Sequence, residues 1–230
     1  MFGAYQAGAW KALHSRFTPD MVIGASIGAM NGWAVASGMH PDELIDRWLH
    51  LNLTRIPDLA ALHAIAGELC GDYRPVRELG VALTRLFPLR PELFRFPKLT
   101  PAHLVASCAA PFFIPPRKIE GRFYIDGGFL GALPLWAAKQ MGATHAVAVH
   151  VMAGLPGWWV AGAATLRWLA RYPRASGQRL ETLWLAPPRL LGGFRAASHW
   201  DRGNVERWIE QGYRDTEAAI ENAHSLPGLL

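Results

Sequence analysis

The sequence predicts an α/β fold built on a mainly parallel sheet. Short runs of β-type residues alternate with longer stretches of helical periodicity along most of the chain. The 230 residues are 51% hydrophobic and 18% charged, which is typical of a globular protein and not of a disordered one. Because a chain of this length can bury one sizeable core, we expect a single domain over residues 1–230.

Apolar spacing and helix-start residues predict the individual elements. Trp10, Leu13 and Phe17 recur at helical spacing, and Pro41 precedes two acidic residues, which suits the first turn of a helix. Residues 52–79 show no clean period and are interpreted as a variable helical or loop excursion. The predicted helices cover residues 3–17, 29–37, 41–51, 101–110, 135–141 and 201–224. The predicted strands cover residues 21–23, 81–86, 92–96, 122–125, 144–151 and 181–185.

A G-x-S-x-G sequence, Gly24 to Gly28, follows the first predicted strand and precedes a helix. A nucleophilic serine on a tight strand-to-helix turn needs small neighbours, because the turn strains the backbone. We expect Gly24 and Gly28 to relieve crowding around Ser26. The N–H groups at the start of the next helix, near Ile27, would favour an oxyanion. The alternative is a serine that only caps the helix.

A second motif, Asp126-Gly127-Gly128, ends the predicted strand over 122–125. A carboxylate at the end of such a strand lies where the active sites of α/β proteins usually gather. If Asp126 hydrogen-bonds Ser26, it can act as the general base that activates the hydroxyl, and partial burial would raise its pKa. The alternative is an ordinary Asp-Gly turn.

Taken together, the two motifs resemble the patatin-like phospholipase family, whose bacterial members are acyl-hydrolases. The resemblance covers roughly residues 1–151 and extends to the helix around Gln211-Gly212-Tyr213, but not to residues 52–79 or 152–200. Its specific stretches are GAYQAGAWKAL, VIGASIGAMNG and ASCAAPFFIPPRKIEGRFYIDGG, which begin at Gly3, Val22 and Ala106.

The resemblance implies a three-layer α/β/α domain with a Ser26–Asp126 dyad and no catalytic histidine. It also implies a serine hydrolase that cleaves acyl esters of phospholipids or related lipids through an acyl-enzyme. In the family, a strand and three consecutive glycines precede the position of Gly3 and supply oxyanion N–H groups. This chain begins at Met1, so we expect it to lack them, with Gly3 and the helix start near Ile27 as partial substitutes.

Two other functions remain open on the sequence alone. A Ser–His–Asp esterase or transacylase would use a histidine after Asp126, and four are present: His145, His150, His199 and His224. Position argues against it, since only one helix and one short strand precede Ser26. A non-catalytic relative that binds lipid or a protein partner is the other alternative.

Charge and targeting signals predict location and partners. The formal net charge is +5, but the sequence has no dense run of Lys and Arg residues. We therefore expect no nucleic-acid partner. We predict a cytoplasmic protein, because there is no signal peptide and Cys70 and Cys108 suit free thiols. Trp and Arg residues over 155–172 are compatible with a lid, with core packing or with peripheral contact to a membrane surface. No ligand cluster or phosphate loop appears, so no metal or cofactor is expected.

Overall fold

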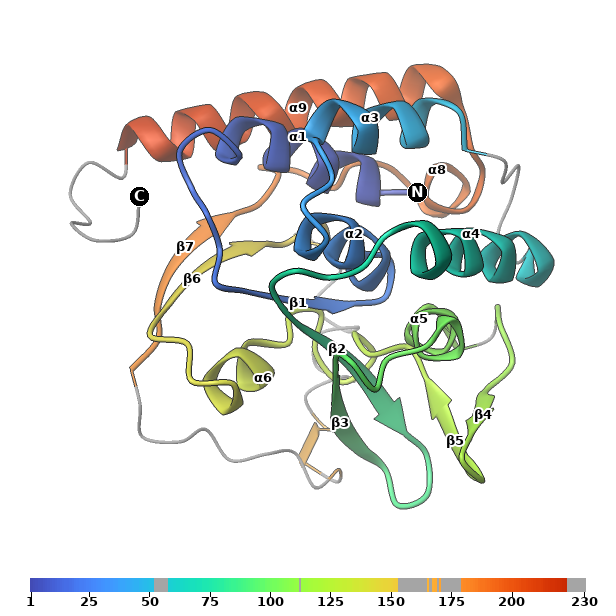
Figure 1. Cartoon of the computed structure of the whole chain (residues 1–230). Coiled ribbons are helices and arrows are strands. Elements are labelled where there is room, and N and C mark those ends of the chain that lie inside the picture. The colour runs from blue at the N-terminus through green and yellow to red at the C-terminus, as the bar shows by residue number, and fades with distance from the viewer. Residues whose placement is uncertain are drawn as a thin grey trace.

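The computed structural model describes residues 1–51, 58–111, 113–152, 165, 167, 168, 170 and 179–222. Its helices are α1 (Gly3–Leu13), α2 (Ile27–Ala36), α3 (Pro41–Leu49), α4 (Leu59–Asp72), α5 (Pro101–Ser107), α6 (Leu135–Gln140), α8 (Phe194–Ser198) and α9 (Arg202–Asn222). Its strands are β1 (Met21–Ala25), β2 (Glu78–Arg85), β3 (Arg90–Arg95), β4 (Arg117–Ile119), β5 (Arg122–Ile125), β6 (His145–Val149) and β7 (Glu181–Leu185). Figure 1 shows this arrangement.

The predicted α/β class is confirmed, but the larger sheet is mixed and not mainly parallel. Strand β1 pairs with β2 in parallel, and β6 pairs with β7 in parallel. Strand β2 is antiparallel to both β3 and β5, and β4 is antiparallel to β5. Short connections explain the β2–β3 and β4–β5 pairs, because a chain that returns within a few residues can only form an antiparallel pair. Glu120 and Gly121, at φ 47° and 78°, join β4 to β5 in the left-handed conformations that tight hairpin turns require.

Several element boundaries differ from the sequence expectation. The first helix ends at Leu13, four residues before the predicted end. The excursion over 52–79 contains the 14-residue helix α4, whose first turn is capped by Asp58 accepting a 2.9 Å hydrogen bond from the Ala61 N–H. Strand β4 and helix α8 were not predicted. Both are short, at three and five residues, and show no readable period.

Helix α1 is held close to α9 by glycines at their crossing. A Cβ on Gly8 would lie 1.9 Å from the carbonyl oxygen of Ile209, and one on Gly212 would lie 2.1 Å from that of Tyr5. The Tyr5 hydroxyl also donates a 2.9 Å hydrogen bond to Asp215 on α9. In Figure 1, α9 runs beside α1 and α3 on one side of the molecule, and α2 lies between these helices and β1. This packing fixes α1 next to the start of α2.

Candidate active site

Ser26 occupies the sharp turn between β1 and α2, as the sequence predicts. Its backbone has φ 54° and ψ −133°, a conformation that a residue with a side chain rarely adopts. Gly24 makes the turn possible, since a Cβ there would lie 2.1 Å from the carbonyl oxygen of Gly28. Gly28 has room, because a Cβ there would meet only the Gln6 side chain, at 3.4 Å. The expectation that both glycines relieve crowding therefore holds for Gly24 alone.

The start of α2 faces the serine. Ile27 is the first residue of this helix, and the first N–H groups of a helix have no intrahelical partner, so they are available to an anion. Gly3 begins α1 and packs against α2 and α3: a Cβ on it would lie 2.6 Å from the Ile27 side chain and 2.4 Å from Trp48. Its carbonyl oxygen accepts a 2.9 Å hydrogen bond from the buried Asn31 side chain. Its local role is thus close packing beside the serine turn.

Asn31 is a site residue that the sequence analysis missed. Its amide nitrogen donates to the Gly3 carbonyl and to the Gln6 side chain, both at 2.9 Å. Its amide oxygen accepts a 3.1 Å hydrogen bond from the indole of Trp48. Asn31 therefore ties α1 and α3 to α2, one turn after the serine. One asparagine in an apolar helix was the only signal available in the sequence.

Asp126 follows β5, is buried, and lies next to the Ser26 side chain. Burial raises its pKa from 3.8 to about 6, while hydrogen bonds from the Ser26 side chain and the Gly128 N–H oppose the rise. The Gly128 N–H lies 2.7 Å from the carboxylate. Gly127 has no room for a side chain, since a Cβ there would lie 1.9 Å from the carbonyl oxygen of Ala82. The fold thus brings the Ser26 and Asp126 side chains together, and the raised pKa makes the Asp126 carboxylate a stronger base than an ordinary aspartate.

Ser107, the last residue of α5, connects both halves of this arrangement. Its fully buried hydroxyl accepts a 2.8 Å hydrogen bond from the backbone N–H of Ser26 and donates a 2.9 Å bond to the carbonyl of Ala82. Its carbonyl oxygen accepts a 3.2 Å bond from the Gly127 N–H. Ser107 therefore holds the serine turn, β2 and the aspartate turn at one point. The sequence analysis missed it, although its small apolar neighbours indicated burial.

Replacing Ser107 with alanine is expected to slow reaction at Ser26 by about 10–100-fold. Loss of the hydroxyl removes the acceptor of the Ser26 N–H and a donor to the Ala82 carbonyl, at a cost of about 1–3 kcal/mol, and the strained turn relaxes. We expect kcat to fall while KM changes little. The check is the pseudo-first-order rate of fluorophosphonate labelling and the kcat/KM pair for an ester substrate.

Thr216→Val is the matched control for this variant. It removes a fully buried hydroxyl from α9 that has no hydrogen-bond partner among the described residues. This variant should label at the parental rate. Parental labelling of Ser107→Ala would show that Ser107 does not position the serine.

A cavity of about 1690 Å³ opens beside Ser26 and Asp126. Its wall beside the serine is mainly apolar and comes from α2, α3 and α4, with Met30, Trp48, Leu62, Ile65 and Leu69. Its other end runs along β1 and β6. Within the described part of the chain, β1 pairs only with β2 and β6 only with β7. The site thus combines a polar reacting pair with a large apolar cavity, which suits a substrate with a long hydrocarbon part.

The histidines that follow Asp126 and the two cysteines were the other predicted features. His145 lies 3.6 Å from Glu181, and His199 lies 3.0 Å from Ser198. His150 lines the cavity, and His224 lies outside the described residues, as does most of the 155–172 stretch. Cys70 and Cys108 are free thiols.

Metal-ligating clusters and membrane-spanning helices are absent from the part of the chain that the structure describes. Over the ranges that the structure describes, His, Cys, Asp and Glu side chains form no group of three or more that could hold a metal ion. Helices in the same ranges are too short or too polar to cross a bilayer.

Comparison with known proteins gives a family and a fold neighbour. The family model described as patatin-like phospholipase matches residues 1–102 and 82–139. No curated protein matches the sequence significantly. Among solved structures, the crystal structure of VipD from Legionella pneumophila is similar, with 13% identity and a TM-score of 0.49. The superposition covers 96% of this chain and 65% of that chain, so this chain spans about 65% of the length of that neighbour.

Proposed function

Because this chain belongs to the patatin-like phospholipase family, we propose that it hydrolyses acyl esters of lipids with Ser26 as nucleophile and Asp126 as general base. The observation that carries the proposal is the meeting of Ser26, on its strained turn, with a buried carboxylate in one cavity, where the serine side chain lies close enough to act on the carboxyl pKa of about 6. Such a carboxylate is mostly ionised at neutral pH and is a stronger base than an ordinary aspartate.

The first half of the proposed reaction forms an acyl-enzyme. Asp126 accepts the proton from the Ser26 hydroxyl as Oγ attacks the ester carbonyl carbon, and the carbonyl electrons move to oxygen. The N–H of Ile27 and the positive end of α2 stabilise this oxyanion. When the tetrahedral intermediate collapses, the bond to the alcohol oxygen breaks, and protonated Asp126 gives its proton to that oxygen.

The second half releases the fatty acid and regenerates the site. Asp126 takes a proton from water as the water oxygen attacks the acyl carbon. Collapse of the second intermediate breaks the bond to Ser26 Oγ, which recovers a proton from Asp126. The Ile27 N–H serves both intermediates. A donor of this kind contributes about 10²–10³ in rate.

The apolar wall of the cavity supports a lipid ester as substrate. The α2, α3 and α4 side chains in this wall offer hydrocarbon contacts that an acyl chain would fill, and burial of each CH₂ contributes about 0.8 kcal/mol. The Ser26 side chain acts directly on the Asp126 carboxyl, which favours the dyad over a Ser–His–Asp triad, in which a histidine would stand between the two.

Fluorophosphonate labelling followed by intact-mass measurement tests the proposal. The parent should gain one phosphonyl adduct, and the Ser26→Ala variant should gain none, because the probe reacts with an activated serine. Release of fatty acid from phospholipid should disappear in the same variant. An adduct that persists in Ser26→Ala, or a folded parent that neither labels nor releases fatty acid, would contradict the proposed function. The second result would instead favour a binding protein with this fold.

A further inference from the structure

Two β-hairpins expose large aromatic side chains at one end of the molecule. Phe87, in the loop between β2 and β3, is 75% exposed, and Phe123 on β5 is 44% exposed. The hairpins are joined where the N–H of Leu86 donates a 3.0 Å hydrogen bond to the carbonyl of Phe123. Full exposure of a phenylalanine leaves its ring in water at a cost of about 1.5–3 kcal/mol relative to burial, so the two rings favour a partner surface.

The β2–β3 hairpin extends farther than the strand that leads to the serine turn. Ala25 pairs with Ala82 in the parallel β1–β2 pair, so both strands end at the same edge of the sheet. Strand β2 continues three residues past Ala82 to Arg85, about 10 Å farther. Phe87 lies beyond that point. The hairpin loop therefore lies beyond the level of the serine turn along β2.

Positive charge surrounds the two phenylalanines. The segments 85–92 and 117–123 contain five cations and two carboxylates: Arg85, Arg90, Arg117, Lys118 and Arg122 against Glu92 and Glu120. Arg85 and Arg90 share Glu92 as their partner. The Lys118 ammonium lies 6.0 Å from the centre of the Phe123 ring. In the described part of the chain, neither Lys118 nor Arg122 forms a salt bridge with a carboxylate.

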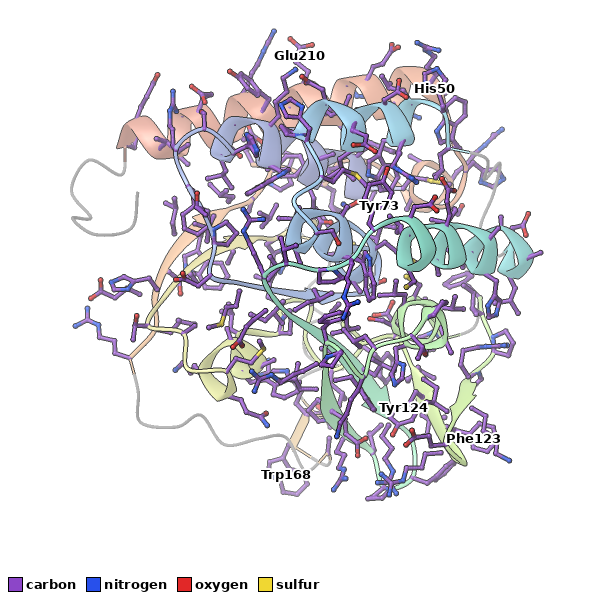
Figure 2. All side chains as sticks on the ribbon, viewed as in Figure 1. His50, Tyr73, Phe123, Tyr124, Trp168 and Glu210 are labelled. Atoms are coloured by element: carbon purple, nitrogen blue, oxygen red, sulfur yellow. The ribbon has the colours of Figure 1, made fainter. Side chains whose placement is uncertain are left out.

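The opposite side of the molecule has the reverse charge. Helix α9 contains three arginines and five carboxylates. Figure 2 places Glu210 of α9 at one extreme of the molecule, with Phe123 toward the other. Trp168, which is 84% exposed, lies toward the same side as Phe123. An anionic surface would attract the hairpin end and repel α9, so the charge distribution orients the protein as well as binding it.

We propose that these two hairpins, through Phe87, Phe123, Lys118 and Arg122, dock the protein on an anionic phospholipid surface. The choice of a bilayer rests on the lipid-ester hydrolysis proposed above, since a bilayer is where the phospholipid esters lie. Phenylalanine rings enter the boundary between headgroups and acyl chains, and nearby lysine and arginine side chains contact anionic headgroups. The two exposed phenylalanines would contact the acyl-chain boundary, and the surrounding cations would contact the headgroup layer.

Vesicle sedimentation tests the docking surface. The parent should bind vesicles of phosphatidylcholine with phosphatidylserine more tightly than vesicles of phosphatidylcholine alone, and salt should weaken the binding. Phe87→Ser should lower the partition coefficient about tenfold, and Lys118→Glu with Arg122→Glu should remove the preference for phosphatidylserine. The matched controls on α9, Tyr213→Ser and Arg214→Glu, should bind as the parent does, because Tyr213 is 39% exposed on the other side.

Labelling without vesicles separates this proposal from the proposed function. Phe87→Ser lies outside the reacting site, so it should label with fluorophosphonate at the parental rate while losing vesicle binding. Parental vesicle binding by the hairpin variants, or an equal loss in the α9 controls, would overturn the docking surface. A parent that labels but does not bind the vesicles would also overturn it. That result would instead favour an acidic protein as the partner of the cationic end.

Discussion

Asp126→Asn is expected to lower kcat/KM and the labelling rate by about 10²–10⁴-fold, the contribution of a well-placed general base. Asparagine keeps the size of the side chain and can still accept from the Gly128 N–H, but it cannot take the proton from Ser26. The expected loss therefore concerns chemistry and not folding. Stopped-flow or discontinuous labelling at pH 8, with an ester assay in parallel, gives both rates.

The pH dependence of the parent follows from the same carboxyl. Its pKa of about 6 means that the ionised, basic form is lost as pH falls through 6. The labelling rate should therefore fall about tenfold for each pH unit below that value and level off above about 7. Asp126→Asn should lose this dependence. A parental profile with no inflection between pH 5 and 7 would contradict the assignment of Asp126 as base.

Stability supplies the control for this variant. The pKa in the folded state, about 6, exceeds the ordinary value of 3.8, so the folded protein binds more protons between these pH values. Stability should then fall as pH rises through that window, by about 3 kcal/mol in total for this group. Asparagine removes the buried charge, so Asp126→Asn should unfold at the parental temperature or above it at pH 8. A large drop in unfolding temperature would attribute its inactivity to misfolding.

The sequence could predict the site more fully than the sheet. Two short glycine-containing motifs indicated the local backbone turns that carry Ser26 and Asp126. These residues are one hundred positions apart in the chain, and they lie together because β1 and β5 both pair with β2. The sequence indicated less clearly whether neighbouring strands pair in parallel or antiparallel. The assumption of a mainly parallel sheet came from the alternation of helices and strands, whereas the short β2–β3 and β4–β5 connections dictate antiparallel pairs.

Residues that act through tertiary contacts were not predictable in the same way. Ser107 and Asn31 matter because of what their buried polar atoms meet, and those partners are 81 and 28 residues away. A single sequence shows neither burial nor partner. For the same reason, the two glycines of the G-x-S-x-G motif look equivalent in the sequence, although only one of them is crowded in the structure.

Gly24→Ala is expected to be far more damaging than Gly28→Ala, although the two glycines lie symmetrically about Ser26. A Cβ on Gly24 would lie 2.1 Å from the Gly28 carbonyl and 2.7 Å from Cα of Ala29, so the first turn of α2 must move. Both contacts are with backbone, which cannot swing aside as a flexible side chain can. We expect a destabilisation of about 3 kcal/mol, and a labelling rate lowered at least about 100-fold because the serine turn is displaced.

Gly28→Ala should cost little, because its Cβ would meet only the end of the Gln6 side chain at 3.4 Å. Alanine is also favoured over glycine in a helix, by about 0.5–1 kcal/mol, so the unfolding temperature should stay level or rise. Thermal unfolding and labelling rates of the two variants, measured side by side, decide the matter. Equal losses in both would mean that the motif needs small residues on both sides of the serine and that the backbone contact at Gly24 is not what sets the turn.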